Sequence, residues 1–134
     1  MPKTARDGAN PSGEPDFLDL IGIDHIEDED GRPDEIAIAP RHLNPFDIVH
    51  GGLIYTLADP SMGGPLLPEL ADNELTATIE IKINYLTAVC DGAIRADTKI
   101  IQRGRRVAVI ESDVYNGERL VVKALGSFAI FEVR

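Results

Sequence analysis

The feature that most constrains the fold is a series of strand-like runs that fills the second half of the chain. From Ile79 to Tyr85, apolar residues alternate with polar ones, which is the period of two that a half-buried β-strand requires. A second alternating run covers residues 94–100, and two further β-rich runs, 107–115 and 119–133, flank Asn116-Gly117. Asn-Gly between such runs predicts a tight hairpin. The pattern therefore predicts four antiparallel strands joined by short turns.

The middle of the chain has a different period. Between Gly51 and Met62 apolar residues recur at spacings of three and four, which predicts a helix. We expect the following Gly63-Gly64-Pro65 and Pro68 to end it. Pro60 lies inside the run, where a missing N–H and a clash with the carbonyl of Thr56 should kink or end the helix.

The N-terminal half adds two shorter strands to this plan. The apolar segment 17–26 predicts a first strand, and the alternation of Ile36 and Ile38 predicts a second, which ends at Pro40. Residues 1–15 are polar and rich in Gly and Pro, so we expect a disordered leader. The expected domain, 16–134, is then of the α+β class, with one helix packed on an antiparallel sheet of about six strands.

Such a sheet leaves much apolar surface uncovered, because one short helix covers only part of one face. Monomers rarely expose large apolar patches. The chain is therefore expected to associate with further copies of itself.

Charge and cysteine content exclude several classes of function. The formal net charge of −10 repels a phosphate backbone, so we expect no nucleic-acid partner. No run approaches the ~20 apolar residues of a membrane helix, and a signal-peptide pattern is missing. A single cysteine, Cys90, fits a reducing compartment, which makes the cytoplasm the expected location. The three histidines lack the paired spacing of metal ligands, so no metal site is expected.

One cluster carries the candidate chemistry. Gly51 and Gly52 lie where a loop enters the predicted helix, and backbone N–H groups there can polarise a substrate carbonyl. Asp59 follows eight residues later, ~12 Å further along a straight helix. A site that uses both Gly51 and Asp59 needs two chains or a bent helix.

A basic turn, Arg103-Gly104-Arg105-Arg106, is expected to be a hairpin with glycine at a positive φ. Arginine side chains match the geometry of phosphate groups. On so acidic a chain, this turn is a candidate site for the phosphates of coenzyme A, through Arg103, Gly104 and Arg105.

These motifs resemble the hotdog-fold acyl-CoA thioesterases of the phenylacetate-degradation type. The resemblance covers roughly residues 40–131 and is carried by Asn44, His50-Gly51-Gly52, Leu57-Ala58-Asp59, Thr78–Leu86, Ala88, Gly92, Arg103-Gly104-Arg105, Leu120-Val121 and Ala124–Phe128. It implies a hotdog fold, with one central helix wrapped by the sheet. It also implies hydrolysis of an acyl- or aryl-CoA thioester to free acid and CoA, without a cofactor other than the substrate's own CoA.

The resemblance also implies a role for each matching residue. The Gly51 N–H would polarise the thioester carbonyl, with Gly52 beside it in the substrate site. Asp59 from a neighbouring subunit would activate water or attack the carbonyl itself. Asn44 would hold substrate or the attacking water, Thr78 would bind that water near Asp59, and His50 would shape the site.

The same family suggests an oligomeric state and two competing hypotheses for the function. A homo-oligomer is implied, a dimer or, more in keeping with the resemblance, a tetramer. A non-catalytic acyl-CoA binder is the alternative function, although the chain carries no DNA-binding module of the kind such sensors use. A dehydratase is the third reading, and the spacing from His50 to Asp59 fits it poorly.

Overall fold

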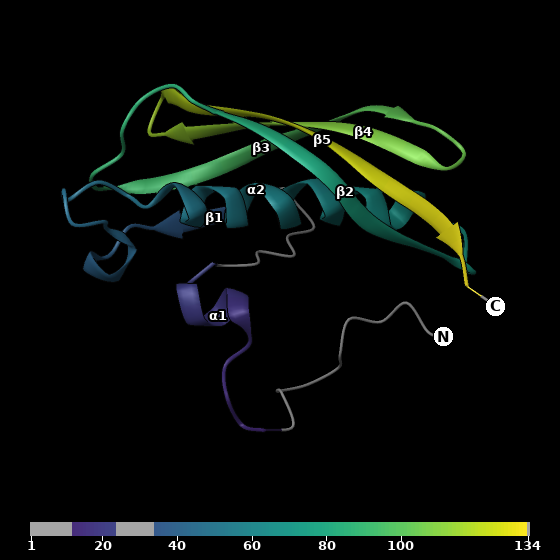
Figure 1. Cartoon of the computed structure of the whole chain (residues 1–134), viewed down its shortest axis with the longest axis horizontal. Helices are drawn as coiled ribbons and strands as arrows, with labels where there is room; N and C mark the ends of the chain where they lie inside the picture. The colour runs from purple at the N-terminus through teal and green to yellow at the C-terminus, as the bar shows by residue number, and fades with distance from the viewer. Residues whose placement is uncertain (1–11, 24–33, 134) are drawn as a thin grey trace.

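The computed structural model describes residues 12–23 and 34–133, in which one long helix lies across one face of a curled antiparallel sheet (Figure 1). The strand order is β1-β3-β4-β5-β2. The strands are β1 (Asp34–Ala37), β2 (Glu74–Tyr85), β3 (Ala93–Arg103), β4 (Val107–Asn116) and β5 (Arg119–Glu132). The helices are α1 (Phe17–Ile21) and α2 (Gly51–Leu66), with single 3-10 turns at Pro40–His42 and Leu67–Glu69. This is the predicted hotdog arrangement.

The four strands predicted from the second half of the chain are confirmed as β2 to β5. Gly117 has a φ of 62° in the β4–β5 turn, a conformation that glycine adopts at no steric cost. β5 is apolar on both sides and lies between β4 and β2, as its composition predicts. The described residues form five strands rather than about six. The predicted disordered leader, 1–15, lies outside the described residues except for its last four.

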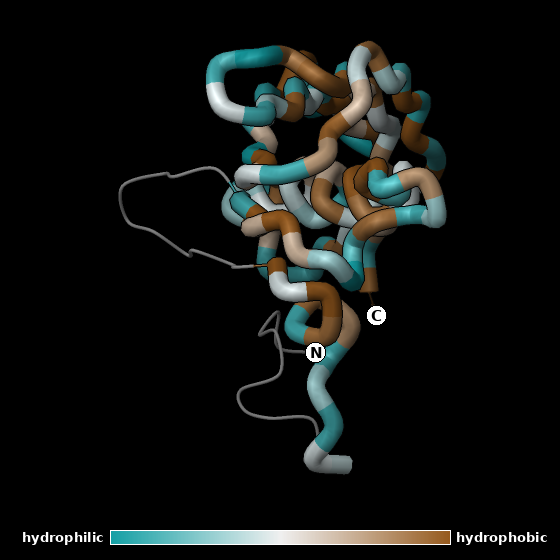
Figure 2. The backbone as a smooth tube through the Cα atoms, turned by 90° about the vertical axis from the view of Figure 1, so that its left-hand side faces the viewer, coloured by the Kyte–Doolittle hydropathy of each residue, from teal (hydrophilic) through white to brown (hydrophobic). Residues whose placement is uncertain are grey.

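The prediction of a first strand over residues 17–26 is wrong for the part that the structure describes. Phe17–Ile21 form a short helix, capped by the side chain of Asp16 on the N–H of Asp19 and closed by Gly22 at a φ of 80°. These local caps outweigh the apolar pattern, since five residues are too few for a period to identify. α1 lies below the sheet and the long helix (Figure 2), and its Phe17 and Leu20 are exposed.

The prediction that Gly63-Gly64-Pro65 end α2 is also wrong. The helix continues through Pro60, Gly63, Gly64 and Pro65 as far as Leu66. Leu57, Met62 and Leu66 are completely buried on its inner side. Burial of large side chains is worth more than the helix propensity that glycine loses, and packing therefore sustains the helix where local sequence opposes it.

The core follows α2 from end to end. One cluster around Leu53, Ile54 and Leu57 packs against β1, β3 and the β4–β5 hairpin, and a second around Ala58, Met62 and Leu66 packs against Ile110 and Phe128. β2 pairs with β5 on one side and forms an edge of the sheet. Its Ile79 and Tyr85 are half exposed or more. An edge strand with exposed apolar side chains is typical of a surface that pairs with another chain.

Candidate active site

The start of α2 is built around two glycines that have different roles. The His50 side chain caps the helix, and its Nδ1 accepts a hydrogen bond of 2.9 Å from the N–H of Gly52. A Cβ on Gly52 would lie 2.9 Å from that nitrogen, so glycine is needed there for the cap. No acceptor for the N–H of Gly51 occurs in the described part of the chain. The Gly51 amide is therefore a backbone donor without an acceptor among the described residues, and its role in polarising a substrate carbonyl stays a prediction.

Tyr85 fixes the same helix start from the neighbouring strand. Its hydroxyl donates to the carbonyl of Gly51 at 2.7 Å. Its ring lies so close that a Cβ on Gly51 would come within 3.1 Å of it. Burial, and to a lesser degree the neighbouring Tyr55, raises the pKa of Tyr85 above its ordinary value, so the hydroxyl stays a donor at neutral pH. Sequence reasoning missed this contact, although Tyr85 shares the inward face of β2 with Ile81 and Ile83.

Asn44 shapes the loop that leads into α2. Its Oδ1 accepts hydrogen bonds from the N–H groups of Phe46 and Ile48, at 2.9 and 3.2 Å. Its own N–H donates to the carbonyl of Ile48 at 2.7 Å. The loop is thus closed on itself by one side chain. The role of Asn44 in holding substrate or water stays a prediction, for which its Nδ2 amide is the available group.

Asp59 and Thr78 form the second centre of the site. The Thr78 hydroxyl donates to Oδ1 of Asp59 at 2.7 Å, across from β2 to the outer side of α2. This carboxylate is the only charged group in the helix, whose sequence is GGLIYTLADPSMGGPL. Thr78 lies where the resemblance expects a hydroxyl beside the carboxylate, although the catalytic role of either residue stays a prediction.

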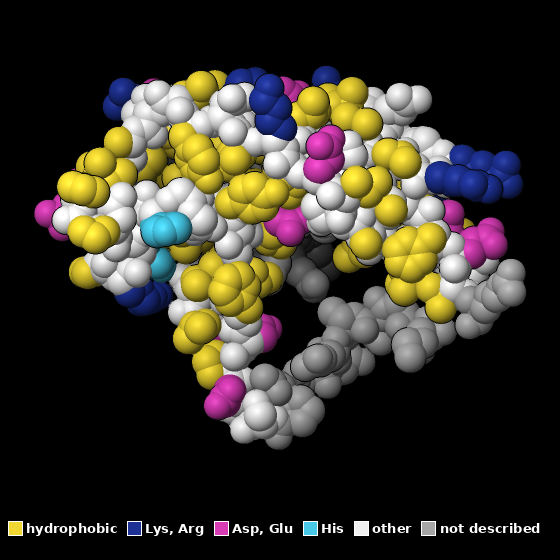
Figure 3. Space-filling view, in the orientation of Figure 1, with side chains coloured by type: hydrophobic (Ala, Val, Ile, Leu, Met, Phe, Trp, Pro, Cys, Tyr) yellow, Lys and Arg dark blue, Asp and Glu magenta, His cyan; other side chains and the backbone are white. Residues whose placement is uncertain are grey.

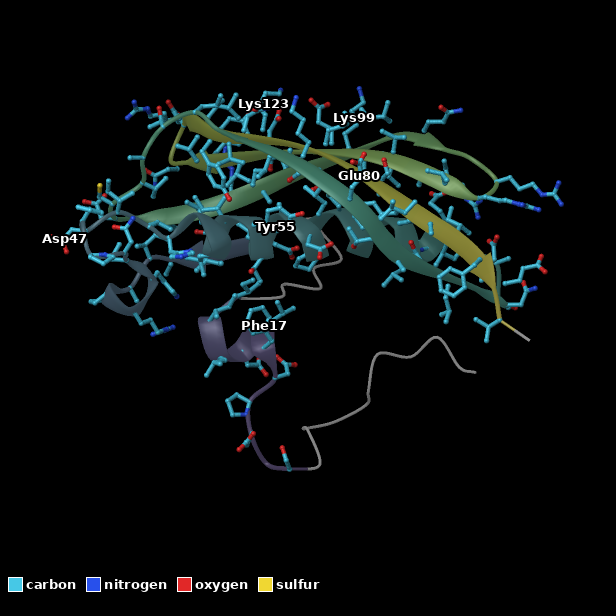
Figure 4. The ribbon with its side chains drawn as sticks, viewed as in Figure 1. Phe17, Asp47, Tyr55, Glu80, Lys99 and Lys123 are labelled. Atoms are coloured by element: carbon cyan, nitrogen blue, oxygen red, sulfur yellow. The ribbon has the colours of Figure 1, made fainter. Side chains whose placement is uncertain are left out.

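A cavity of about 420 Å³ opens beside Asp59. Its walls are mostly apolar or lack a side chain, and they consist of Asp59, Pro60, Gly63, Gly64, Leu67, Thr76, Ala77, Thr78 and Phe128. A second cavity, of about 340 Å³, lies at the other end of the helix beside Gly51 and Tyr85. Within one chain the two centres therefore have separate cavities. The labelled Tyr55 lies in the N-terminal half of α2, midway along the sequence between Gly51 and Asp59 (Figure 4).

The basic turn holds two kinds of arginine. Arg103 points inward along the sheet end, with Nη2 2.8 Å from Glu74 Oε1 and 3.1 Å from the carbonyl of Glu69. Arg105 and Arg106 are exposed, and Lys and Arg side chains project at this end of the molecule (Figure 3). A stabilising role thus competes with phosphate binding at Arg103 but not at Arg105.

The predicted positive φ of Gly104 is wrong. Glycine is needed there for a different reason, because a Cβ would lie 2.6 Å from the carbonyl oxygen of Val107. That carbonyl accepts the N–H of Gly104 at 2.9 Å and closes the turn.

His42 is hydrogen-bonded to the backbone of its own chain and has a structural role. His42 is buried, with Nδ1 accepting from the N–H of Ala39 and Nε2 2.6 Å from the carbonyl of Ile21. Among the described residues, His, Cys, Asp and Glu form no group of three that could hold a metal ion. The same residues contain no helix that is long and apolar enough to cross a membrane.

Comparisons with known proteins identify the family of the chain. A family model described as the thioesterase superfamily matches residues 46–123. A Saccharolobus solfataricus protein, named only as a candidate esterase, is 29% identical over 85 residues, which are 63% of this chain and 56% of that protein. The chain thus spans little more than half the length of that relative.

Two solved structures show the same fold. A Bacillus halodurans protein crystallised with CoA has a TM-score of 0.76 at 31% identity, over 85% of this chain and 74% of that one. A Ralstonia eutropha protein, described as a candidate thioesterase related to phenylacetic acid degradation, has a TM-score of 0.73 over 91% and 92% of the two chains. At 19% identity the second likeness is one of fold. On the family match and the shared fold, this chain belongs to the thioesterase superfamily.

Proposed function

We propose that the chain hydrolyses an acyl-CoA thioester to the free acid and CoA, at sites shared between two copies of the chain. The observation that carries the proposal is the Asp59–Thr78 pair on a helix face with no other charge. A helix face exposed to water normally carries several charged residues, and this chain has 27% of them. The face around Asp59 is better suited to a partner and a substrate than to solvent.

Spacing along α2 argues for two copies. Eight residues separate Gly51 from Asp59, which is ~12 Å of helix, and α2 is continuous between them. An antiparallel second copy, related by a two-fold axis at the midpoint Tyr55, would bring the partner's Gly51 opposite Asp59. The same operation would bring Gly51 opposite the partner's Asp59, because a two-fold interface is reciprocal.

The edge strand β2 is compatible with the same axis. The Tyr55 hydroxyl donates to the carbonyl of Ile81 at 3.3 Å, so Ile81 lies beside the residue through which the proposed axis passes. If β2 paired with its copy around Ile81, Glu80 would face the partner's Lys82 and Lys82 would face the partner's Glu80. Opposite charges at facing positions favour an antiparallel strand pair. The self-complementary segment Glu80-Ile81-Lys82 thus supports a dimer as the unit of the site.

In this site the two centres have complementary roles. The Gly51 N–H stabilises the oxyanion as negative charge develops on the thioester oxygen. Asp59 of the other copy either takes a proton from water as that water attacks the carbonyl, or attacks the carbonyl itself and forms a mixed anhydride. In either route the C–S bond breaks, and the departing CoA sulfur takes up a proton that comes from water. In the second route water then hydrolyses the anhydride, which releases the free acid and restores the Asp59 carboxylate. The Thr78 hydroxyl either donates a hydrogen bond to the Asp59 oxygen that does not react, or binds the attacking water beside Asp59.

The CoA moiety is proposed to bind with its phosphates near the basic turn. Arg105 and Arg106 are exposed, and their guanidinium groups have no partner among residues 12–23 and 34–133, whereas Arg103 is engaged by Glu74. We therefore favour Arg105 over Arg103 as a phosphate contact. The reaction needs no other cofactor, and a CoA ester as substrate suits a cytoplasmic location. A tetramer, as the family resemblance favours, would pair two such dimers.

Thiol release from a panel of acyl-CoAs, with Asp59→Asn as the paired variant, tests the function. Losing a general base is expected to lower kcat by about 100-fold or more. Folding should be unchanged, because an Asn oxygen can still accept from Thr78. Equal turnover by the variant would refute the role of Asp59. An inactive parent that is nevertheless stabilised by CoA esters would instead indicate the alternative, a non-catalytic acyl-CoA binder.

A further inference from the structure

Phe46 is held in an unusual position. Its side chain is 81% exposed, more than that of any other large apolar residue described. The loop that carries it is nevertheless rigidly built, with two hydrogen bonds to Asn44 Oδ1, a bridge between Leu43 and Val49, and Asp47 at a φ of 60°. A non-glycine residue in that conformation costs free energy. The loop thus holds an aromatic ring away from its own chain.

The cavity beside Asp59 is open on one side, where it is lined by glycines that have no side chain. A Cβ added to Gly64 would meet nothing within 4 Å, and one added to Gly63 would first meet Phe128 at 3.9 Å. Leu67, at the outer rim, is 54% exposed. The two glycines leave the outer wall of this apolar cavity open.

The two-fold axis of the proposed function relates these two features. The loop that carries Phe46 precedes the N-terminal end of α2, and the cavity beside Asp59 lies toward the C-terminal end, where Gly64 and Leu67 line it. When Gly51 faces the partner's Asp59, the two-fold rotation turns the Phe46 loop toward that end of the partner's helix. In Figure 4 the labelled Asp47, next to Phe46, lies beyond the N-terminal end of α2, and Tyr55 lies further along the helix, midway between Gly51 and Asp59 in the sequence. A rotation about Tyr55 carries that loop to the cavity end of the partner.

We propose that Phe46 of each copy forms the outer wall of the acyl cavity beside the partner's Asp59 and limits the length of acyl group that the site accepts. This inference rests on the proposed shared site. The wall is completed by an aromatic ring, and the other sides consist of Phe128, Leu67 and the two glycines. Such a closed apolar cavity selects compact acyl groups, short aliphatic or aryl, over long chains.

The test is the ratio of kcat/KM for dodecanoyl-CoA to that for butanoyl-CoA, measured for the parent and for Phe46→Ala. Removing the wall is expected to raise this ratio at least about tenfold, since even one methylene in an apolar pocket can change specificity by that factor. Phe17→Ala is the matched control, because Phe17 is a second exposed phenylalanine, 62% accessible, on α1. Its ratio should equal that of the parent.

A second variant approaches the cavity from the other wall. Gly64→Leu adds bulk where a side chain meets nothing and should lower the same ratio. An unchanged ratio in Phe46→Ala, or an equal loss of activity on both substrates, would overturn the inference while leaving the hydrolase intact. Failure of the proposed function itself would be seen separately, as full activity in Asp59→Asn.

Discussion

The two ends of α2 differ in how firmly they are held. At the Gly51 end, the helix start is fixed by the His50 cap, by the Tyr85 hydroxyl on the Gly51 carbonyl, and by Thr56 Oγ1, which donates to the Gly52 carbonyl at 2.8 Å. At the Asp59 end, the helix contains two prolines and two glycines. Within the described residues, Thr78 is the only hydrogen-bond partner of the Asp59 side chain.

The difference corresponds to the two tasks of the proposed reaction. A donor that stabilises an oxyanion is effective only if it is already aimed, because reorganisation would cost part of the gain. An acyl group needs space, and glycine and proline provide it on the helix surface beside Asp59. Each chain thus holds one firmly held centre and one open centre, and the proposed two-fold dimer would join the firmly held centre of one copy to the open centre of the other.

Among variants that separate the two ends of α2, Gly51→Pro is expected to lower kcat the most, because it removes the backbone N–H of residue 51. Proline is favoured at the first helical position, and the extended conformation of His50 is compatible with a following proline. Loss of one oxyanion donor should lower kcat by about 100- to 1,000-fold. Steady-state kinetics with the best substrate would measure this.

Gly51→Ala is the matched control, because it places the same Cβ against Tyr85 and keeps the N–H. It should retain most of the activity. If alanine and proline were equally damaging, crowding against Tyr85 would explain the loss and the donor role would be wrong.

A smaller effect is expected at the open end, from Thr78→Val. The change keeps the shape of the side chain and removes one hydrogen bond to Asp59, worth about 0.5–1.5 kcal/mol. We expect kcat to fall about 2- to 10-fold. Thr76→Val on the same strand removes a bond of 2.8 Å to the carbonyl of Ala129 instead. Should Thr76→Val lower kcat as much as Thr78→Val, the Thr78 bond would have no special part in the reaction.

Much of the fold could be predicted from the sequence because long periodic runs report burial directly. The alternation in β2 and the Asn116-Gly117 turn identified strands that the sheet confirms. The predicted end of α2 was wrong because burial of Met62 and Leu66 depends on β5, which is distant in sequence. The short α1 was missed because its identity rests on two caps, Asp16 and Gly22, rather than on a period.

The candidate site divides in the same way. The proximity of Asp59 and Thr78 was implied by the family resemblance. The cap that His50 forms was not predicted, because histidine is not among the residues preferred at a helix N-cap. The contact of Tyr85 with Gly51 spans 34 residues, so no local pattern could reveal it. The engagement of Arg103 by Glu74 was missed for the same reason.

The central claim, that each site combines Gly51 of one copy with Asp59 of the other, is tested most directly by mixing two inactive variants. Asp59→Asn and Gly51→Pro chains would be unfolded together, refolded and assayed for thiol release. A mixed dimer holds one intact site, made by Asp59 of the proline variant and Gly51 of the asparagine variant. Random pairing of equal amounts predicts about a quarter of the parent activity. A mixture no more active than the two separate variants would contradict the shared site.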